Sequence, residues 1–186
     1  INTLLNVYFI NCNSMEADGD TIAADFAAYL GGIGEKDEIH IDTMTTLDDE
    51  DLSNYGTANQ MKMTAYIAAG DVDVLLLNQS AYDKYDGSGA FCNLSTVLTK
   101  EQLSQWSDIL VYGTIEKQTE SESEAGSDET GSDGGKEVPV ALQMQDAAIV
   151  KNFNAYYGEP VYAVILGNSK HTEMAAEFIG YLLNEE

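Results

Sequence analysis

Residues 60–80 read QMKMTAYIAAGDVDVLLLNQS, and this stretch decides the fold. Its first half consists of good helix formers, and Gly70 supplies the left-handed residue that ends a helix. The apolar run formed by Val72, Val74, Leu75, Leu76 and Leu77 is too continuous for a strand with one wet face, so it predicts a strand covered on both faces. The polar residues 78–80 then form a loop at the carboxyl end of that strand. In open α/β sheets, ligands bind at this edge.

The rest of the chain alternates predicted strands and helices around this unit. Residues 4–11 and 38–43 predict two more strands, with a helix between them that begins at an Asp20 N-cap. Strands that alternate with helices form right-handed βαβ units, which predicts a parallel sheet. The second half is expected to hold short helical pieces over 81–106, with Thr99 as an N-cap, strands over 108–115, 138–144 and 159–167, a weak helix over 146–157 and a closing helix from Lys170. We therefore expect a single α/β domain over residues 1–186, with three αβα layers and a mainly parallel sheet.

The charge of the chain is strongly one-sided. Eight Lys and no Arg stand against 32 Asp and Glu, which gives a formal net charge of −24. Nucleic acid is excluded as a partner, because neutralising phosphates requires clustered cations, and binding to anionic membrane surfaces is disfavoured for the same reason. The missing Arg also removes the usual bidentate clamp for carboxylates and phosphates. A neutral or cationic ligand is favoured over an anionic one.

Residues 116–137 form a segment of different composition. It contains eight acids and no large apolar residue. Such a segment cannot bury enough apolar surface to offset its ordering entropy, so we expect a mobile acidic loop.

Cysteine, histidine and acidic residues give no sign of catalysis or of a metal site. Cys12 and Cys92 are expected to be small buried residues, with a mutual disulfide as the alternative. His40 and His171 lie far apart and have no evident partner, which leaves no transition-metal cluster. The acids of residues 16–20 have the spacing of a calcium loop but lack its bidentate Glu, so a turn before a helix is favoured. No nucleophile motif, phosphate loop or dinucleotide fingerprint is present, and we expect neither an enzyme nor a cofactor.

Two stretches resemble a known family. The first is IAAGDVDVLLLNQSAYDKYDGSGAFCNLSTVL (67–98), and the second is VYAVILGNSKHTEMAAEFIGYLLNEE (161–186). Both are similar to the first lobe of bacterial extracellular solute-binding proteins with the type II periplasmic-binding-protein fold. That family closes two lobes around a solute, and the second lobe normally lies between these stretches. Here only residues 106–160 are available, so the second lobe is expected to be absent or reduced to a flap.

The resemblance also implies a location. No apolar run approaches the roughly 20 residues that span a bilayer. The chain opens at Ile1 without an initiator Met, so we expect that a leader or anchor precedes it and tethers the domain outside the cytoplasmic membrane, as in a lipoprotein.

The strongest candidates for a ligand site are polar residues after the first and third strands. Their amides, hydroxyls and aromatic ring suit neutral hydrogen bonding and stacking with a sugar or short peptide. They are Asn11, Asn13, Ser14, Asn78, Gln79, Ser80 and Tyr82. The alternative is that they only cap helices and make turns. Two functions therefore remain open: binding of a small neutral solute, or an envelope protein-interaction or structural domain that has the fold without a cleft.

Two tyrosines have alternative roles, and two methionines have one expected role. Tyr156 and Tyr157 are candidates either for lining a cleft or for core packing, and Met61 is expected in the core beside Met63.

Overall fold

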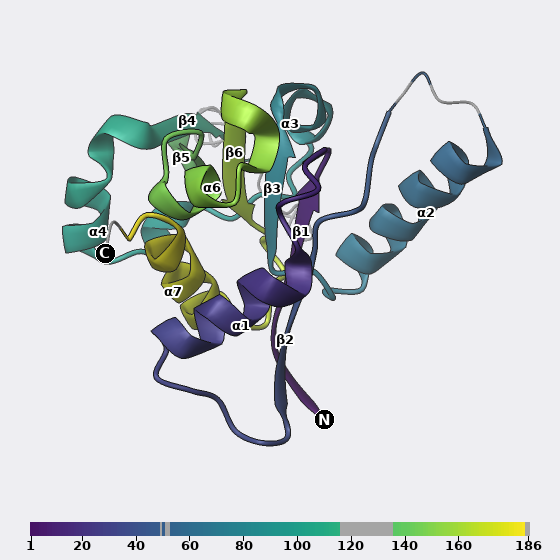
Figure 1. The fold of residues 1–186 in the computed structure, drawn as a ribbon. Coiled ribbons are helices and arrows are strands. Elements are labelled where there is room, and N and C mark those ends of the chain that lie inside the picture. Colours follow the sequence, from purple (N-terminus) through teal and green to yellow (C-terminus); the bar gives the residue numbers. More distant parts are fainter. Residues whose placement is uncertain (49, 51–52, 116–135, 185–186) are drawn as a thin grey trace.

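The computed structural model describes residues 1–48, 50, 53–115 and 136–184. Within them lies one six-stranded sheet of mixed direction (Figure 1). In spatial order its strands are β2 (Asp37–Asp42), β1 (Asn2–Ile10), β3 (Val74–Asn78), β6 (Val161–Ile165), β5 (Glu137–Gln143) and β4 (Leu110–Thr114). The chain is therefore an α/β protein, as its strand and helix pattern predicts.

The direction of the strands departs from the expected sheet in its second half. β1 pairs in parallel with β2 and with β3, which are the strands that alternate with helices in the sequence. The pairs β3–β6, β6–β5 and β5–β4 are all antiparallel. The prediction of a mainly parallel sheet is thus wrong beyond β3, because apolar patterning identifies a strand without giving its direction.

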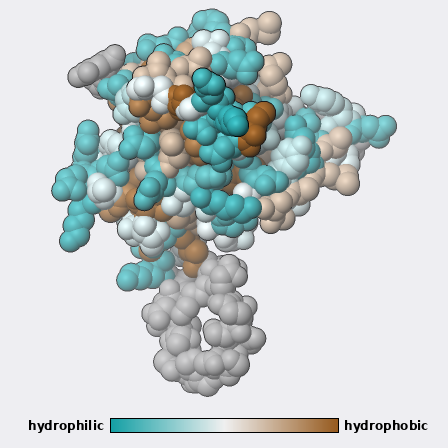
Figure 2. Space-filling model, turned by 90° about the horizontal axis from the view of Figure 1, so that it is seen from below, coloured by the Kyte–Doolittle hydropathy of each residue, from teal (hydrophilic) through white to brown (hydrophobic). Residues whose placement is uncertain are grey.

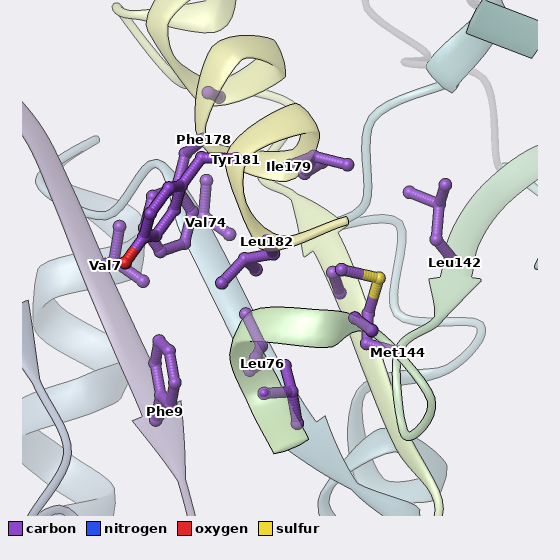
Figure 3. Packing of buried hydrophobic residues seen from close by; sticks show 14 of the residues in the cluster. Val7, Phe9, Val74, Leu76, Leu142, Met144, Phe178, Ile179, Tyr181 and Leu182 are labelled. Atoms are coloured by element: carbon purple, nitrogen blue, oxygen red, sulfur yellow. The ribbon is translucent and has the colours of Figure 1, made fainter. Parts of the chain in front are cut away.

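Helices cover both faces of the sheet, which makes three layers. On one face, α1 (Gly19–Tyr29) and α7 (Thr172–Leu182) pack Phe26, Phe178 and Tyr181 against Val7 and Phe9 of β1 (Figures 1 and 3). On the other face, α2 (Asn54–Ala68) and α3 (Gln79–Tyr85) contribute to a second buried cluster, which includes Met63, Tyr82, Ile10, Leu75 and Leu77. Successive residues of β1 and β3 alternate between these clusters, as the pleat requires.

The stretch that decides the fold has the predicted structure except at its end. Gly70 has φ +76° directly after α2, and residues 72–77 are fully buried. The expected polar loop at residues 78–80 does not exist, because Asn78 is both the last residue of β3 and the N-cap of α3. A side-chain oxygen that accepts from the third residue of a helix lets a helix begin without a connecting loop.

Other local predictions have mixed outcomes. Asp18 rather than Asp20 caps α1, while Thr99 caps α4 (Lys100–Gln105) through a complete capping box. The α6 helix (Ala148–Asn152) lies within the stretch predicted as weakly helical. Cys12 and Cys92 are buried free thiols.

The acidic loop and the expected anchor are largely outside what the structure describes. Of the predicted loop 116–137, residues 116–135 lie outside the described residues, and Glu137 opens β5. None of the described helices has the length and apolar character needed to cross a membrane.

Candidate functional site

The carboxyl ends of β1 and β3 lie side by side, because the two strands pair in parallel as far as Ile10 and Leu77. A hollow of about 590 Å³ opens beside them. Four predicted site residues line it: Asn11, Asn13, Asn78 and Ser80. The other lining residues come from the segment before α2 and from α3; they are Thr46, Leu47, Asp48, Glu50, Ala81 and Lys84. These four residues therefore lie around one hollow, as expected for residues that follow neighbouring parallel strands.

Asn11 connects two segments that line the hollow. Its Oδ1 accepts from the Leu47 amide at 2.8 Å, and its Nδ2 donates to the Leu47 carbonyl at 3.0 Å and to Asn78 Oδ1 at 3.1 Å. Both donors and one of the two acceptor lone pairs of this side-chain amide are thereby directed into the protein. Asn11 therefore serves mainly to fix the lining of the hollow, and only the second lone pair of its Oδ1 is left for a ligand.

Asn78 is partly engaged in the same way. Its Oδ1 accepts from the Ala81 amide at 3.0 Å, which is the N-cap bond of α3, and from Ser80 Oγ at 3.3 Å. This is the capping role that the alternative interpretation assigns to Asn and Ser. The exposed Ser80 hydroxyl keeps acceptor capacity toward the hollow.

Asn13 has the most freedom to meet a ligand. Its side chain is exposed, and none of the hydrogen bonds among the described residues involves it. Its backbone has φ 54°, and that of Asn11 has φ 60°. Non-glycine residues rarely adopt this backbone conformation, and they keep it only where the surrounding structure holds them in it. Such residues cluster at functional sites.

A second strained turn packs against this loop. Asn154, Tyr156 and Tyr157 also have positive φ, and with Asn11 and Asn13 they are the only non-glycine residues in the described part that do. The Tyr156 hydroxyl donates to the carbonyls of Ile10, at 2.8 Å, and Leu76, at 3.1 Å, so it ties the ends of β1 and β3 together. Tyr156 is a core residue, and its exposed neighbour Tyr157 does not line the hollow.

Three predicted site residues lie elsewhere. Ser14 is buried, and its Oγ accepts from the Glu16 amide. Gln79 points to the other side of α3, where Tyr162 donates a hydrogen bond of 2.8 Å to Gln79 Oε1. Tyr82 is buried between Phe91 and Tyr162, and burial, assisted by Asp86, raises the pKa of its phenol to about 12. The sequence could not separate these residues from the four in the hollow, because the turn of α3 decides which way Gln79 and Tyr82 face, and the local turn before α1 directs Ser14 inward.

A polar cluster around the buried Asp73, at the opposite end of β3, was not predicted from the sequence. Asp73 is fully buried and accepts from the Asn6 amide at 2.8 Å and from Ser169 Oγ at 2.7 Å. His171 Nδ1 lies 3.1 Å from Asp73 Oδ2, so His171 has a partner, contrary to expectation. The two residues are 98 positions apart in the chain, and no local pattern connects them.

The groups that line the hollow are able to recognise a polar ligand. Among the residues that the structure describes, no three His, Cys, Asp or Glu are arranged to hold a metal ion. Burial raises the pKa of the Cys12 and Cys92 thiols, which disfavours the nucleophilic thiolate. The hollow is lined by amides, a hydroxyl, the rim carboxylates and the Lys84 ammonium, and such groups bind polar solutes by hydrogen bonds.

Comparison with known proteins identifies no relative. No protein-family model, curated protein or solved structure matches the chain.

Proposed function

We propose that the protein is a recognition domain, not an enzyme, and that it binds a small polar solute in the hollow at the carboxyl ends of β1 and β3. The observation that carries the proposal is the hollow itself, with the exposed Asn13 side chain held at its rim by a strained backbone. Its position matches the edge at which open α/β sheets bind ligands. Location outside the cytoplasmic membrane and kinship with solute-binding proteins rest on the sequence resemblance alone.

The charges around the hollow favour a neutral or cationic solute. Asp48 and Glu50 stand at its rim together with Lys84, in a chain of net charge −24. An anion would enter against this field, whereas a sugar, a short peptide or an amine would not. The Asn13 amide and the Ser80 hydroxyl supply neutral donors and acceptors.

A thermal-shift screen with saccharides, amino acids, short peptides and amines tests the proposal. A ligand at about 100 times its dissociation constant stabilises by about 2.7 kcal/mol. For a chain of this length, that corresponds to a rise of roughly 5–10 °C in midpoint.

Asn13→Gly is the decisive variant, because it removes the amide while glycine accepts the positive φ without strain. Asn154→Gly is its matched control, since Asn154 has a similar φ of 57° and does not line the hollow. We expect the ligand-induced shift to fall in Asn13→Gly and to persist in Asn154→Gly. A flat screen, or equal shifts in both variants, would refute the proposed site.

A second function is favoured by a specific observation. Three of the four hydrogen-bonding positions of the Asn11 amide are used inside the protein, and Asn78 Oδ1 accepts from within the protein too, as expected of residues that only build a turn. A protein-interaction or structural domain of the cell envelope is therefore the second candidate. A flat solute screen combined with a specific protein partner would select it.

A further inference from the structure

Two methionines extend into solvent beside the same pocket. Met15 is 95% exposed in the β1–α1 connection, and Met44 is 75% exposed in the segment after β2. Single exposed apolar residues are ordinary on a protein surface, and Figure 2 shows brown ones scattered among teal ones. Met15 and Met44 differ from these because both line one pocket of about 320 Å³. We call it the Met15–Met44 pocket.

Parallel pairing of β1 and β2 brings the two methionines together. Tyr8 of β1 lies opposite Asp42 of β2, so the segments that follow the two strands leave the same edge of the sheet. The Thr43 hydroxyl donates to the Ala17 carbonyl at 2.6 Å and joins these segments directly. The pocket shares no lining residue with the hollow beside β1 and β3, so it is a separate site.

The backbone around each methionine is held in place, whereas the side chain is not. Asp42 Oδ1 accepts from the Met44 amide at 2.9 Å. Ser14 Oγ accepts from the Glu16 amide at 3.2 Å, which closes a turn around Met15. A Met side chain has three rotatable bonds, so each thioether can turn into the pocket from a fixed backbone position.

His40 adds an imidazole to the same pocket. It is exposed on β2, which is an edge strand of the sheet. Its ring packs edge-on against Tyr8, with the ring centroids 5.6 Å apart. Among the described residues, no hydrogen bond involves this ring, so its nitrogens are available to a ligand.

We propose that the Met15–Met44 pocket binds a soft monovalent metal ion of the Cu⁺ and Ag⁺ class, with Met15, Met44 and His40 as its ligands. Thioether ligands select Cu⁺, and imidazole also suits copper. Ca²⁺ and Mg²⁺ instead prefer carboxylate, carbonyl and water oxygens. The sequence-based expectation of no metal site rested on cysteine, histidine and acidic residues, whereas this site is built on thioethers.

The carboxylates around the pocket attract a cation without being its main ligands. Asp18, Asp20 and Asp42 line the pocket, and its described lining includes no Lys. One oxygen of Asp18 already accepts from the Thr21 amide at 2.9 Å and from the Thr21 hydroxyl at 2.7 Å. Asp42 Oδ1 is engaged by the Met44 amide. These acids raise the local concentration of cations, and the thioethers then select a soft one.

Nuclear magnetic resonance of the whole chain, with ¹³C-labelled Met methyl groups, tests the proposal. The titrant is Ag⁺ in chloride-free buffer, because Ag⁺ is a redox-stable substitute for Cu⁺. We expect the methyl signals of Met15 and Met44 to shift together and to saturate at one ion per chain. Met61, which was expected in the core but is 67% exposed on α2, is the internal control. Its signal should stay in place, because Met61 does not line the pocket.

Conservative variants identify the ligands. Met15→Leu and Met44→Leu each remove one thioether with little change in volume. In competition with bicinchoninate for Cu⁺ under anaerobic conditions, each should weaken binding at least about tenfold, since loss of even an indirect partner of a metal costs about 10–100-fold. His40→Gln should also weaken binding. Met61→Leu is the matched control and should bind as the wild type does.

Several results would overturn the proposal. One is the absence of a saturable shift, and another is a shift of Met61 equal to those of Met15 and Met44. A Ca²⁺ titration that saturates the same signals at the same concentration would assign the pocket to a hard cation. Binding that survives the two pocket Met→Leu changes but is lost in Cys12→Ser or Cys92→Ser would place the ion on a thiol.

Discussion

Removal of the buried carboxylate of Asp73 is expected to destabilise the protein more than any surface change. Asp73 is fully buried at the start of β3 and receives hydrogen bonds from the Asn6 amide and Ser169 Oγ, with His171 Nδ1 at 3.1 Å. These contacts tie the β6–α7 connection to β1 and β3. Asp73→Ala would leave partly buried donors from two segments of the chain, β1 and the β6–α7 connection, without their acceptor.

The magnitude follows from those contacts. A hydrogen bond to a charged group contributes about 1.5–3 kcal/mol, and the contributions are not additive. We count the Asn6 and Ser169 bonds in full and discount the His171 contact, because that side chain is 34% exposed. The expected loss is about 3–5 kcal/mol, a large part of the typical 5–15 kcal/mol of a domain. The thermal midpoint should fall by about 10 °C.

Urea denaturation followed by circular dichroism measures this loss. Asp71→Ala is the control, since Asp71 is an exposed acid two residues away and its loss should change stability by less than about 0.5 kcal/mol. If Asp73→Ala costs less than about 1 kcal/mol, or no more than Asp71→Ala, the reasoning about the buried cluster is wrong.

Two further predictions concern close packing and pH. A Cβ on Gly19 would collide with the carbonyl oxygen of Ile41, whereas on Gly180 it would meet only open space and the Tyr29 hydroxyl at 3.9 Å. Thermal melts should therefore show Gly19→Ala destabilised by at least about 1 kcal/mol and Gly180→Ala unchanged or more stable by up to about 1 kcal/mol. Burial raises the pKa of Tyr8 and Tyr82 from 10 to about 12. The unfolded chain releases these phenol protons at lower pH than the folded chain does, so this contribution to stability should be present below pH 10 and lost between pH 10 and 12. Thermal unfolding midpoints that stay constant across this pH range would contradict the prediction.

The sequence identified the local elements more completely than their assembly. The continuous apolar run before Asn78 and the left-handed Gly70 are local signals, and both led to the correct helix and strand. β6 pairs antiparallel with β3, which is distant in the sequence. The hydrophobic periodicity of a strand does not predict its partner or its direction.

The candidate site was predictable in position but not in detail. Parallel pairing of β1 and β3 brings Asn11 and Asn78 within hydrogen-bonding distance, as their places after the strands indicated. The sequence does not reveal that the Asn11 side chain forms two hydrogen bonds with the Leu47 backbone, or that Tyr82 faces the core. Both outcomes depend on side-chain direction once the segment before α2 and the turn of α3 are in place.

The most direct test of the central claim is a titration followed by nuclear magnetic resonance of the ¹⁵N-labelled protein, with the best ligand from the solute screen. The account predicts that the side-chain amide signal of Asn13 and the backbone signals around Asn78 and Ser80 shift in a saturable way, since these residues line the hollow. A second hollow of about 590 Å³, lined by residues that include Ala68, Phe91 and Asn93, serves as the internal reference. Shifts confined to that second hollow, or no saturable shift anywhere, would contradict the account.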